Sequence, residues 1–256
     1  MIDPKAIIDS KAQLDENVTV GPFSVIGPDV KIGAGTVIGP HVVIKGPTRI
    51  GQDNRIYQFS SIGEDPQDKK YAAEITRLEI GDRNTIREFV TMHRGTKQDR
   101  SVTQIGSDNL FMAYTHVAHD CVIGNHVILA NGASLAGHVR LNSHAILGGF
   151  TLVHQFTQIG QYSFAAMGST ITQDIPPFVM VGGRPTRPHG INSVGMERNG
   201  ISPEDIRLIR KAYKMIYKMN LRMDDAIDQM EDLAGDSKEL SDMVSFLRNV
   251  TRGILR

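Results

Sequence analysis

The sequence has few of the residues that most folds use to fill or cross-link a core. Its 256 residues include one cysteine, no tryptophan and only 6% aromatic residues. The single thiol, Cys121, excludes an internal disulfide framework and a zinc site built from several cysteines, and we expect it to be a small buried residue. A chain of this length buries a sizeable core. So few aromatic residues favour a narrow interior filled by aliphatic side chains.

The sequence also lacks a charge excess and a long apolar segment. Lys and Arg number 28, and Asp and Glu also number 28. This balance argues against nucleic acid as a partner, because nucleic-acid binding needs a basic surface. No run approaches eighteen apolar residues, so we expect no stable membrane insertion. The opening residues do not have the pattern of a signal peptide, which predicts a cytoplasmic protein.

An aliphatic residue recurs at every sixth position. One run extends from Ile8 to Ile62, and a second extends from Ile105 to Ile171. A period of six matches neither an α-helix nor a simply alternating strand. It is the hexapeptide signature of a parallel β-helix, in which three hexads close a triangular coil of eighteen residues. Small residues two positions before the aliphatic ones fit beside them, and we expect glycine or asparagine to turn the corners.

The period divides the chain into two regions. Residues 1–190 are predicted to form the β-helix, with loop excursions near 64–77 and 94–104 where the period is interrupted. A linker rich in glycine and proline follows Pro177. Residues 191–256 are predicted to form a small α-helical domain. Its first long helix is expected over 202–219, because Ser202 and Pro203 suit the N-cap and first helical positions. Two more helices are expected over 223–234 and 238–249.

One face of the first long helix is basic. The opposite face is apolar, so the helix is amphipathic. The basic face is either solvated or a docking surface for an acidic partner. The basic residues that fall largely on this face are Arg207, Arg210, Lys211, Lys214, Lys218 and Arg222.

Histidines cluster when the sequence is folded into coils of eighteen residues. Residues eighteen apart lie on adjacent coils, about 4.8 Å apart. None of the clustered residues occupies an inward aliphatic position, so we expect an outward-facing patch. Its members are His119, Gly137 and Gln155, spaced by eighteen, with His138, His154 and His116 beside them.

Three functions remain open for this patch: general-base catalysis, metal binding, or an ordinary polar surface. A glycine stacked on His119 would expose a backbone N–H close to a base, which is the arrangement of an oxyanion hole. Asp120 directly follows His119. Neighbours in a strand point to opposite faces, so Asp120 could orient this imidazole only at a corner of the coil.

Several longer motifs are more specific than the hexad. They are IYQFSSIGEDPQDKKY at 56–71, HRGT at 93–96, HVAHD at 116–120, LAGHV at 135–139 and VHQF at 153–156. With these motifs the whole chain resembles the UDP-N-acetylglucosamine 3-O-acyltransferases of lipid A biosynthesis. The resemblance implies a left-handed coil and a homotrimer with sites between neighbouring β-helices. It also implies transfer of an (R)-3-hydroxyacyl group from acyl carrier protein to the 3-hydroxyl of UDP-N-acetylglucosamine, without a cofactor or metal.

The resemblance also implies functions for individual residues. His119 would be the general base, Asp120 its partner, and Gly137 the N–H donor to the oxyanion. Further substrate contacts would come from Gln67, Asp68, Lys70, His116, His138, His154, Gln155, Asn192 and Arg198. The chain departs from the family pattern at Val194, where the family can carry a glutamate, and at Asn199, where it can carry a second arginine.

Three other functions compete with this one. A trimeric zinc hydratase of the same architecture could use His116 and His119 as ligands, which metal analysis would detect. A sugar acyltransferase could use coenzyme A in place of a carrier protein, which donor preference would reveal. A non-enzymatic trimeric scaffold would tolerate His119→Ala in every functional assay.

Met167 generates a first prediction. Some family members carry glycine here, at a position that limits acyl length, so a bulky Met167 should favour chains of ten or twelve carbons over fourteen. Met167→Gly should raise relative transfer of the fourteen-carbon chain by roughly tenfold or more. Competition between 3-hydroxyacyl carrier proteins of the three lengths measures this. An unchanged preference would show that Met167 does not limit the length of the acyl chain.

Overall fold

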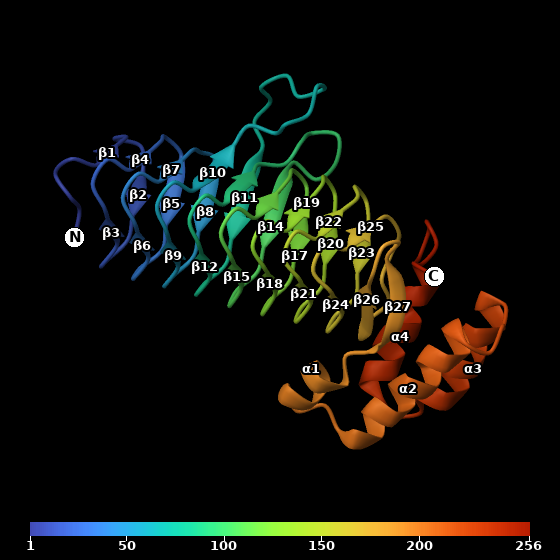
Figure 1. Ribbon diagram of the computed structural model, residues 1–256. Helices are drawn as coiled ribbons and strands as arrows, with labels where there is room; N and C mark the ends of the chain where they lie inside the picture. Colours follow the sequence, from blue (N-terminus) through green and yellow to red (C-terminus); the bar gives the residue numbers. More distant parts are fainter.

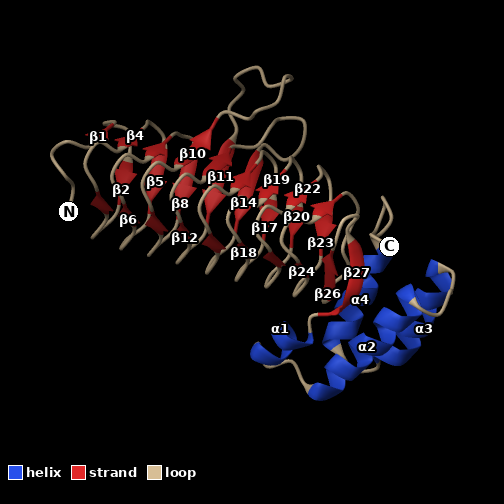
Figure 2. Cartoon of the chain, in the orientation of Figure 1, coloured by secondary structure: helices blue, strands red, loops and turns tan.

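The computed structural model describes all 256 residues and is a triangular β-helix followed by helices (Figure 1). Its strands are mostly two residues long, and each pairs in parallel with the strand one coil earlier and one coil later. The predicted fold class is therefore confirmed. Figure 2 shows the helices gathered at the end of the coil opposite the N-terminus.

Three sheets form the sides of the coil. The first sheet consists of β1 (Ile7–Ile8), β4 (Val25–Ile26), β7 (Val43–Ile44), β10 (Ser61–Glu64), β13 (Thr91–His93), β16 (His116–Val117), β19 (Ser134–Leu135), β22 (Leu152–Val153) and β25 (Thr170–Ile171). The second consists of β2 (Gln13–Leu14), β5 (Val30–Ile32), β8 (Thr48–Ile50), β11 (Arg77–Ile80), β14 (Val102–Ile105), β17 (Val122–Ile123), β20 (Arg140–Leu141) and β23 (Gln158–Ile159). The third consists of β3 (Thr19–Val20), β6 (Val37–Ile38), β9 (Arg55–Ile56), β12 (Thr85–Ile86), β15 (Leu110–Phe111), β18 (Ile128–Leu129), β21 (Ile146–Leu147), β24 (Phe164–Ala165), β26 (Val179–Gly182) and β27 (Arg187–Ile191).

The aliphatic residue of each hexad points into the coil. Ile26, Ile44 and Ile62 are aligned on successive strands of the first sheet and are almost fully buried. Burying one such side chain is worth about 1.5–3 kcal/mol relative to leaving it exposed. Cys121 is also buried, as expected, and its burial raises the pKa of the thiol to about 12.

Each coil turns three corners, which differ in chemistry. The corner from the third to the first sheet, here the aromatic corner, stacks Phe23, His41 and Phe59. The corner from the second to the third sheet, the amide corner, contains Asn54 and Asn84. The corner from the first to the second sheet, the site corner, carries the two loop excursions and His119.

Glycine does not turn most corners, which corrects the sequence expectation. Phe23, Asp53 and Arg83 are among the many non-glycine residues with positive φ at these turns. Glycine is needed instead where coils approach closely. A Cβ on Gly33 would lie 2.6 Å from the carbonyl carbon of Gly51 on the next coil. A recurring glycine such as Gly33 is therefore explained by spacing between coils, while Gly35, Gly132 and Gly168 are corner glycines that do have positive φ.

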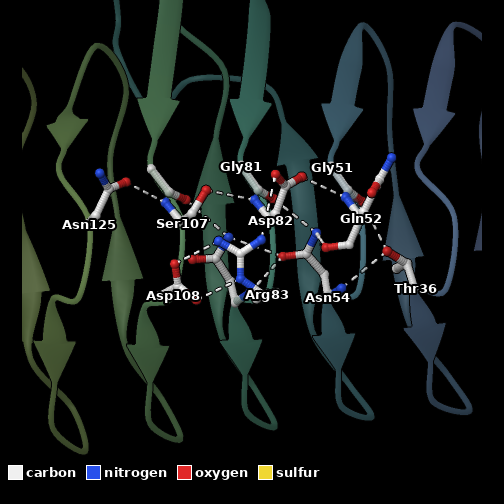
Figure 3. A network of polar contacts seen from close by, with 12 residues as sticks. Thr36, Gly51, Gln52, Asn54, Gly81, Asp82, Arg83, Ser107, Asp108 and Asn125 are labelled. Atoms are coloured by element: carbon white, nitrogen blue, oxygen red, sulfur yellow. Dashed lines mark hydrogen bonds and ion pairs between the residues drawn. The ribbon is translucent and has the colours of Figure 1, made fainter.

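Side-chain amides connect the coils along the amide corner (Figure 3). Asn84 donates through Nδ2 to Asn54 Oδ1 at 3.0 Å and to Gly106 O at 3.0 Å. Its own Oδ1 accepts from the backbone N–H of Asn109 at 3.0 Å. Because Asn84 is fully buried, these bonds satisfy backbone groups that water cannot reach.

Both loops are shorter than the sequence suggested, and the region after Pro177 forms strands. The first loop occupies residues 65–76, between β10 and β11. The second is residues 94–101, because β14 already begins at Val102. The expected linker after Pro177 is wrong: β26 extends the third sheet, and β27 pairs with it in antiparallel. Gly183 has a positive φ between these strands and helps the chain to reverse.

The C-terminal helices follow the expected boundaries closely. They are α2 (Pro203–Tyr217), α3 (Met223–Ala234) and α4 (Lys238–Arg248), while α1 (Ser193–Arg198) was not expected. Ser202 caps α2 by accepting from the N–H of Asp205 at 3.0 Å. No helix has the length and apolar character required to cross a membrane.

The amide corner generates a prediction about stability. Asn84→Ala removes the bonds to Gly106 O and to the Asn109 N–H, so both buried groups lose their partner. The free energy of unfolding should fall by about 2–4 kcal/mol. Asn142→Ala is the matched control, because Asn142 is exposed and should change stability by less than about 0.5 kcal/mol. Urea denaturation at a fixed protein concentration measures both, and equal effects would contradict the prediction.

Candidate active site

The residues with chemical potential lie along the site corner. Both loops rise from this corner (Figure 1), and the next coils place His119, then Gly137 and His138, then His154 and Gln155 on it. The eighteen-residue spacing predicted this column. What the spacing could not predict is which side chains contact one another.

His119 and Asp120 are hydrogen bonded. His119 Nδ1 lies 2.8 Å from Asp120 Oδ2. The side chain of His119 is 13% exposed, whereas that of Asp120 is fully buried. Asp120 has a φ of 60°, so the corner turns its side chain back towards the preceding imidazole. The question that the sequence left open is answered: Asp120 sits at a corner and orients His119.

The second loop holds Asp120 in place. The backbone N–H of Thr96 donates to its carboxylate at 2.9 Å, and the Thr96 hydroxyl donates at 2.7 Å. The Asp120 N–H in turn donates to Thr103 Oγ1 at 2.8 Å. Burial raises the pKa of Asp120, but hydrogen bonds from His119 and Thr96 outweigh it and the net pKa is lowered. The carboxylate is therefore ionised and accepts a hydrogen bond from His119 Nδ1–H. In the neutral ring the proton is on Nδ1, so Nε2 is unprotonated.

Gly137 lies directly beneath the imidazole of His119. A Cβ on Gly137 would come within 2.5 Å of His119 Cε1 and 2.7 Å of Nε2, so only glycine leaves room for the ring. The Gly137 N–H has no acceptor within the chain. Pro28 and Pro40 occupy the equivalent hexad position, immediately before a residue with positive φ. The coil therefore does not need this N–H, and Gly137 offers it beside a base.

His138 packs against His119 at the next coil. Their rings meet edge to face with centroids 5.0 Å apart, and Phe156 stacks on the other side of His138 at 4.3 Å. Asp99, from the second loop, lies 2.9 Å from His138 Nδ1. Sequence reasoning missed Asp99 and Thr96, because neither lies on the eighteen-residue column.

His116 lies one strand before this cluster. Its Nδ1 is 2.7 Å from Thr91 Oγ1, and its ring meets that of His93 edge to face. Burial, followed by the proximity of His119, lowers the pKa of His116. Burial also lowers the pKa of His93 to about 4. Both rings are therefore neutral at pH 7.

The first loop is held by Arg94. This buried guanidinium bonds to Gly63 O, to the Asp65 carboxylate and, at 3.1 Å, to the Tyr71 hydroxyl. The arginine of the HRGT motif therefore shapes a loop. On that loop Gln67 and Lys70 are exposed and Asp68 is half-buried, with its carboxylate accepting from the Lys70 N–H at 2.9 Å.

The C-terminal tail closes the far end of the column. His154 and Gln155 are exposed there. The guanidinium of Arg252 donates to Gln155 O at 3.1 Å and lies over the Phe156 ring. Nothing in the sequence pattern indicated that residues 250–256 return to this corner.

The C-terminal region, residues 174–255, matches the family model described as UDP N-acetylglucosamine O-acyltransferase, domain 2. Residues 11–46 and 103–137 match the bacterial transferase hexapeptide model. A protein of Halorhodospira halophila named acyl-[acyl-carrier-protein]–UDP-N-acetylglucosamine O-acyltransferase is 59% identical, with 100% of this chain and 99% of that protein covered.

The chain belongs to the UDP-N-acetylglucosamine O-acyltransferase family. The structure of LpxA from Acinetobacter baumannii has a TM-score of 0.97 and 47% identity, covering 100% of this chain and 99% of that one. An acyltransferase of Arabidopsis, at 31% identity, still gives a TM-score of 0.86 over the full length of both chains. The coil has the left-handed winding of these O-acyltransferase structures.

Three residues that the O-acyltransferase resemblance implicated lie away from the column within one chain. Met167 is 78% exposed at the aromatic corner. Asn192 is buried at the end of the amide corner, where Oδ1 caps α1 and Nδ2 donates to Tyr162 O at 2.9 Å. Arg198 is exposed at the end of α1 and has no ion pair within the chain. One chain therefore does not bring them to His119.

The geometry does not favour the zinc hydratase alternative. One group of side chains has potential metal-ligand atoms within 4.8 Å of one another, and it consists of His119, Asp120 and His138. His116, which the hydratase would use as a ligand, is not in this group. The Asp120 oxygens already accept from His119 and Thr96. These contacts fit a hydrogen-bonded histidine–aspartate pair, as expected for an O-acyltransferase of this family.

The buried His93 generates a pH prediction. In the unfolded chain its pKa is near 6.5, and in the folded protein it is about 4. The unfolded state therefore binds the extra proton first, and stability is lost as pH falls from 6.5 towards 4, by about 3 kcal/mol from this group. His93→Gln should flatten that part of the pH–stability curve, and His126→Gln is the exposed control. Thermal melts at several pH values measure the slope, and an unchanged slope would refute the assignment.

Proposed function

We propose that this protein transfers an (R)-3-hydroxyacyl group from acyl carrier protein to the 3-hydroxyl of UDP-N-acetylglucosamine, in lipid A biosynthesis. The observation that carries the proposal is the pair formed by His119 and Asp120 above Gly137. It combines an oriented base with a free backbone N–H, which are the two elements that acyl transfer from a thioester requires. The relatives reported above bear the name of this reaction.

The first step begins at His119 Nε2. Since Nδ1–H is bonded to Asp120, Nε2 is the free acceptor and takes the proton from the sugar hydroxyl as its oxygen attacks the thioester carbonyl. Asp120 stabilises the imidazolium that results. A base held in this way contributes about 10²–10⁴ in rate.

The tetrahedral oxyanion then needs a donor. The Gly137 N–H is the group we assign to it, and one such donor is worth about 10²–10³. When the intermediate collapses, the C–S bond breaks and the His119 imidazolium returns its proton to the carrier thiolate. The products are the sugar ester and free thiol, so the reaction needs no metal or cofactor.

The acyl chain has an apolar path beside this centre. Leu152 is 53% exposed on the first sheet, and Phe150 and Met167 are 69% and 78% exposed where that sheet begins. An acyl chain lying across these side chains would remove them from water. Met167 would then contact the end of the acyl chain and limit its length.

We also propose that the protein works as a homotrimer. Leu110, Ile128, Ile146 and Phe164 form an outward row on adjacent strands of the third sheet, which an isolated chain would leave partly in water. Contiguous apolar surface of this kind marks protein association. A neighbouring chain could bring Asn192 and Arg198 to the nucleotide, completing a site with His154, Gln155, Gln67, Asp68 and Lys70.

The carrier protein would dock on α2. The six basic residues, of which Lys218 caps the end of α2 and Arg222 precedes α3, are all exposed, and only Arg207 has an ion pair, with Glu204. Unpaired cations on one face attract an acidic partner and raise its association rate. A cytoplasmic location is part of the same proposal.

A direct assay tests the proposal. Purified protein with UDP-N-acetylglucosamine and 3-hydroxyacyl carrier protein should form the acylated sugar nucleotide, with carrier-bound donor preferred over the coenzyme A thioester. His119→Ala should lower kcat/KM by about 10²–10⁴. Gly137→Ala should lower it by about 10² or more, because its Cβ displaces the imidazole and misplaces the donor.

Gly149→Ala is the matched control for Gly137→Ala. Gly149 occupies the same hexad position at another corner, and a Cβ there would meet only Asn131 O at an ordinary 3.4 Å. Its activity should stay within about twofold of the parent, because the added methyl group displaces no side chain and lies at the aromatic corner, away from His119. No product from any donor would reject the acyltransferase. Full activity of His119→Ala would reject the assigned base.

A further inference from the structure

A second histidine of the site has its own carboxylate partner. His138 Nδ1 lies 2.9 Å from Asp99 Oδ2, and Asp99 belongs to the second loop, 39 positions earlier in the chain. The His138 side chain is 14% exposed and that of Asp99 is 37% exposed. The ring therefore borders the open part of the site while its Nδ1 edge is occupied.

The contact determines which nitrogen of His138 is available. An ionised carboxylate only accepts hydrogen bonds, so Nδ1 carries the proton and Nε2 presents its lone pair when the ring is neutral. Nε2 is 3.9 Å from Asp120 Oδ2, beyond hydrogen-bond distance. It has no partner within the chain, so it is free to accept from a ligand.

The ring cannot easily adopt another orientation. Phe156 stacks on one face at 4.3 Å, and His119 meets the ring edge to face at 5.0 Å. The charged and titratable groups around it are Asp99, Asp120 and His119, with the Arg252 guanidinium beyond Phe156. Packing limits the tilt of the ring, and Asp99 selects its tautomer.

We propose that Asp99 is a positioning residue that holds His138 with Nε2 directed into the site, where it accepts a hydrogen bond from a hydroxyl of the sugar substrate. The identity of the acceptor substrate rests on the proposed function. The same loop then serves both histidines, because Thr96 anchors the partner of His119 and Asp99 is the partner of His138. The second loop therefore contacts two successive coils and orients a histidine on each.

Binding measurements test this inference separately from turnover. Calorimetry gives the Kd of UDP-N-acetylglucosamine for the full-length protein and for Asp99→Ala, Asp99→Asn and Asp99→Glu. Asp99→Ala should raise this Kd, and the KM for the same substrate, by about tenfold, the scale of a lost charge-assisted hydrogen bond. Both kcat and the KM for the acyl carrier protein should stay within about twofold, because the interaction binds the sugar equally in the ground and transition states. Asp99→Glu should recover part of the affinity.

Arg100→Gln is the control for loop integrity, since Arg100 is adjacent, exposed and directed to Gln104. It should bind the sugar nucleotide like the parent. Proton NMR checks the hydrogen bond between Asp99 and His138 directly, through the low-field resonance of the His138 Nδ1–H proton. This resonance is assigned by its loss in His138→Gln. It should disappear in Asp99→Ala and persist in Arg100→Gln and His119→Ala.

The outcomes separate the two proposals. If Asp99→Ala loses the resonance and about tenfold in sugar affinity, the inference stands, even if the parent protein transfers no acyl group and the proposed reaction fails. If the resonance survives in Asp99→Ala, the pairing is rejected. If it is lost while the affinity for UDP-N-acetylglucosamine is unchanged, Asp99 has only a structural function and the inference is overturned.

Discussion

The structure depends on the burial of one aliphatic side chain in every hexad. Aliphatic side chains fill most of this narrow interior, and Phe111 and Phe178 are its fully buried phenylalanines, which is why the fold needs no tryptophan and few aromatic residues. Because burial is repeated coil by coil, each coil is held at the spacing of strands in a sheet. That spacing determines what lies outside the coil, since a side chain at a corner lies above its equivalent on the preceding coil, eighteen residues earlier wherever no loop intervenes.

Short strands leave the corners free to differ. Two residues per strand are enough for the ladder, so loops can be inserted at a corner without disturbing the interior. Phe23, His41 and Phe59 stack along the aromatic corner. Buried amides connect the coils at the amide corner, as Asn84 does between Asn54 and Asn109. The third corner carries both loops together with His119, His138 and His154. A rigid frame thus supports the site, and the second loop supplies the contacts that orient its imidazoles.

Local patterns predicted the parts of the fold that repeat. The period of six predicted the coil, and the Ser202–Pro203 cap predicted α2. The prediction was wrong where the period ends. The residues after Pro177 contain Gly183 and Pro185 and were expected to be a linker, but they form the hairpin of β26 and β27. Glycine was also expected at corners for its conformation, whereas contact between coils is what demands it.

The sequence by itself determined the fold class, the family and the column of His119, Gly137 and Gln155, because each depends on a spacing or motif along the chain. Only the tertiary structure decided how that column works. Asp120 faces His119 because the corner gives it a positive φ, which a strand would not. Thr96 and Asp99 reach the histidines because a loop folds back over two coils. Such contacts join residues with no fixed separation in sequence, so no periodicity could have predicted them.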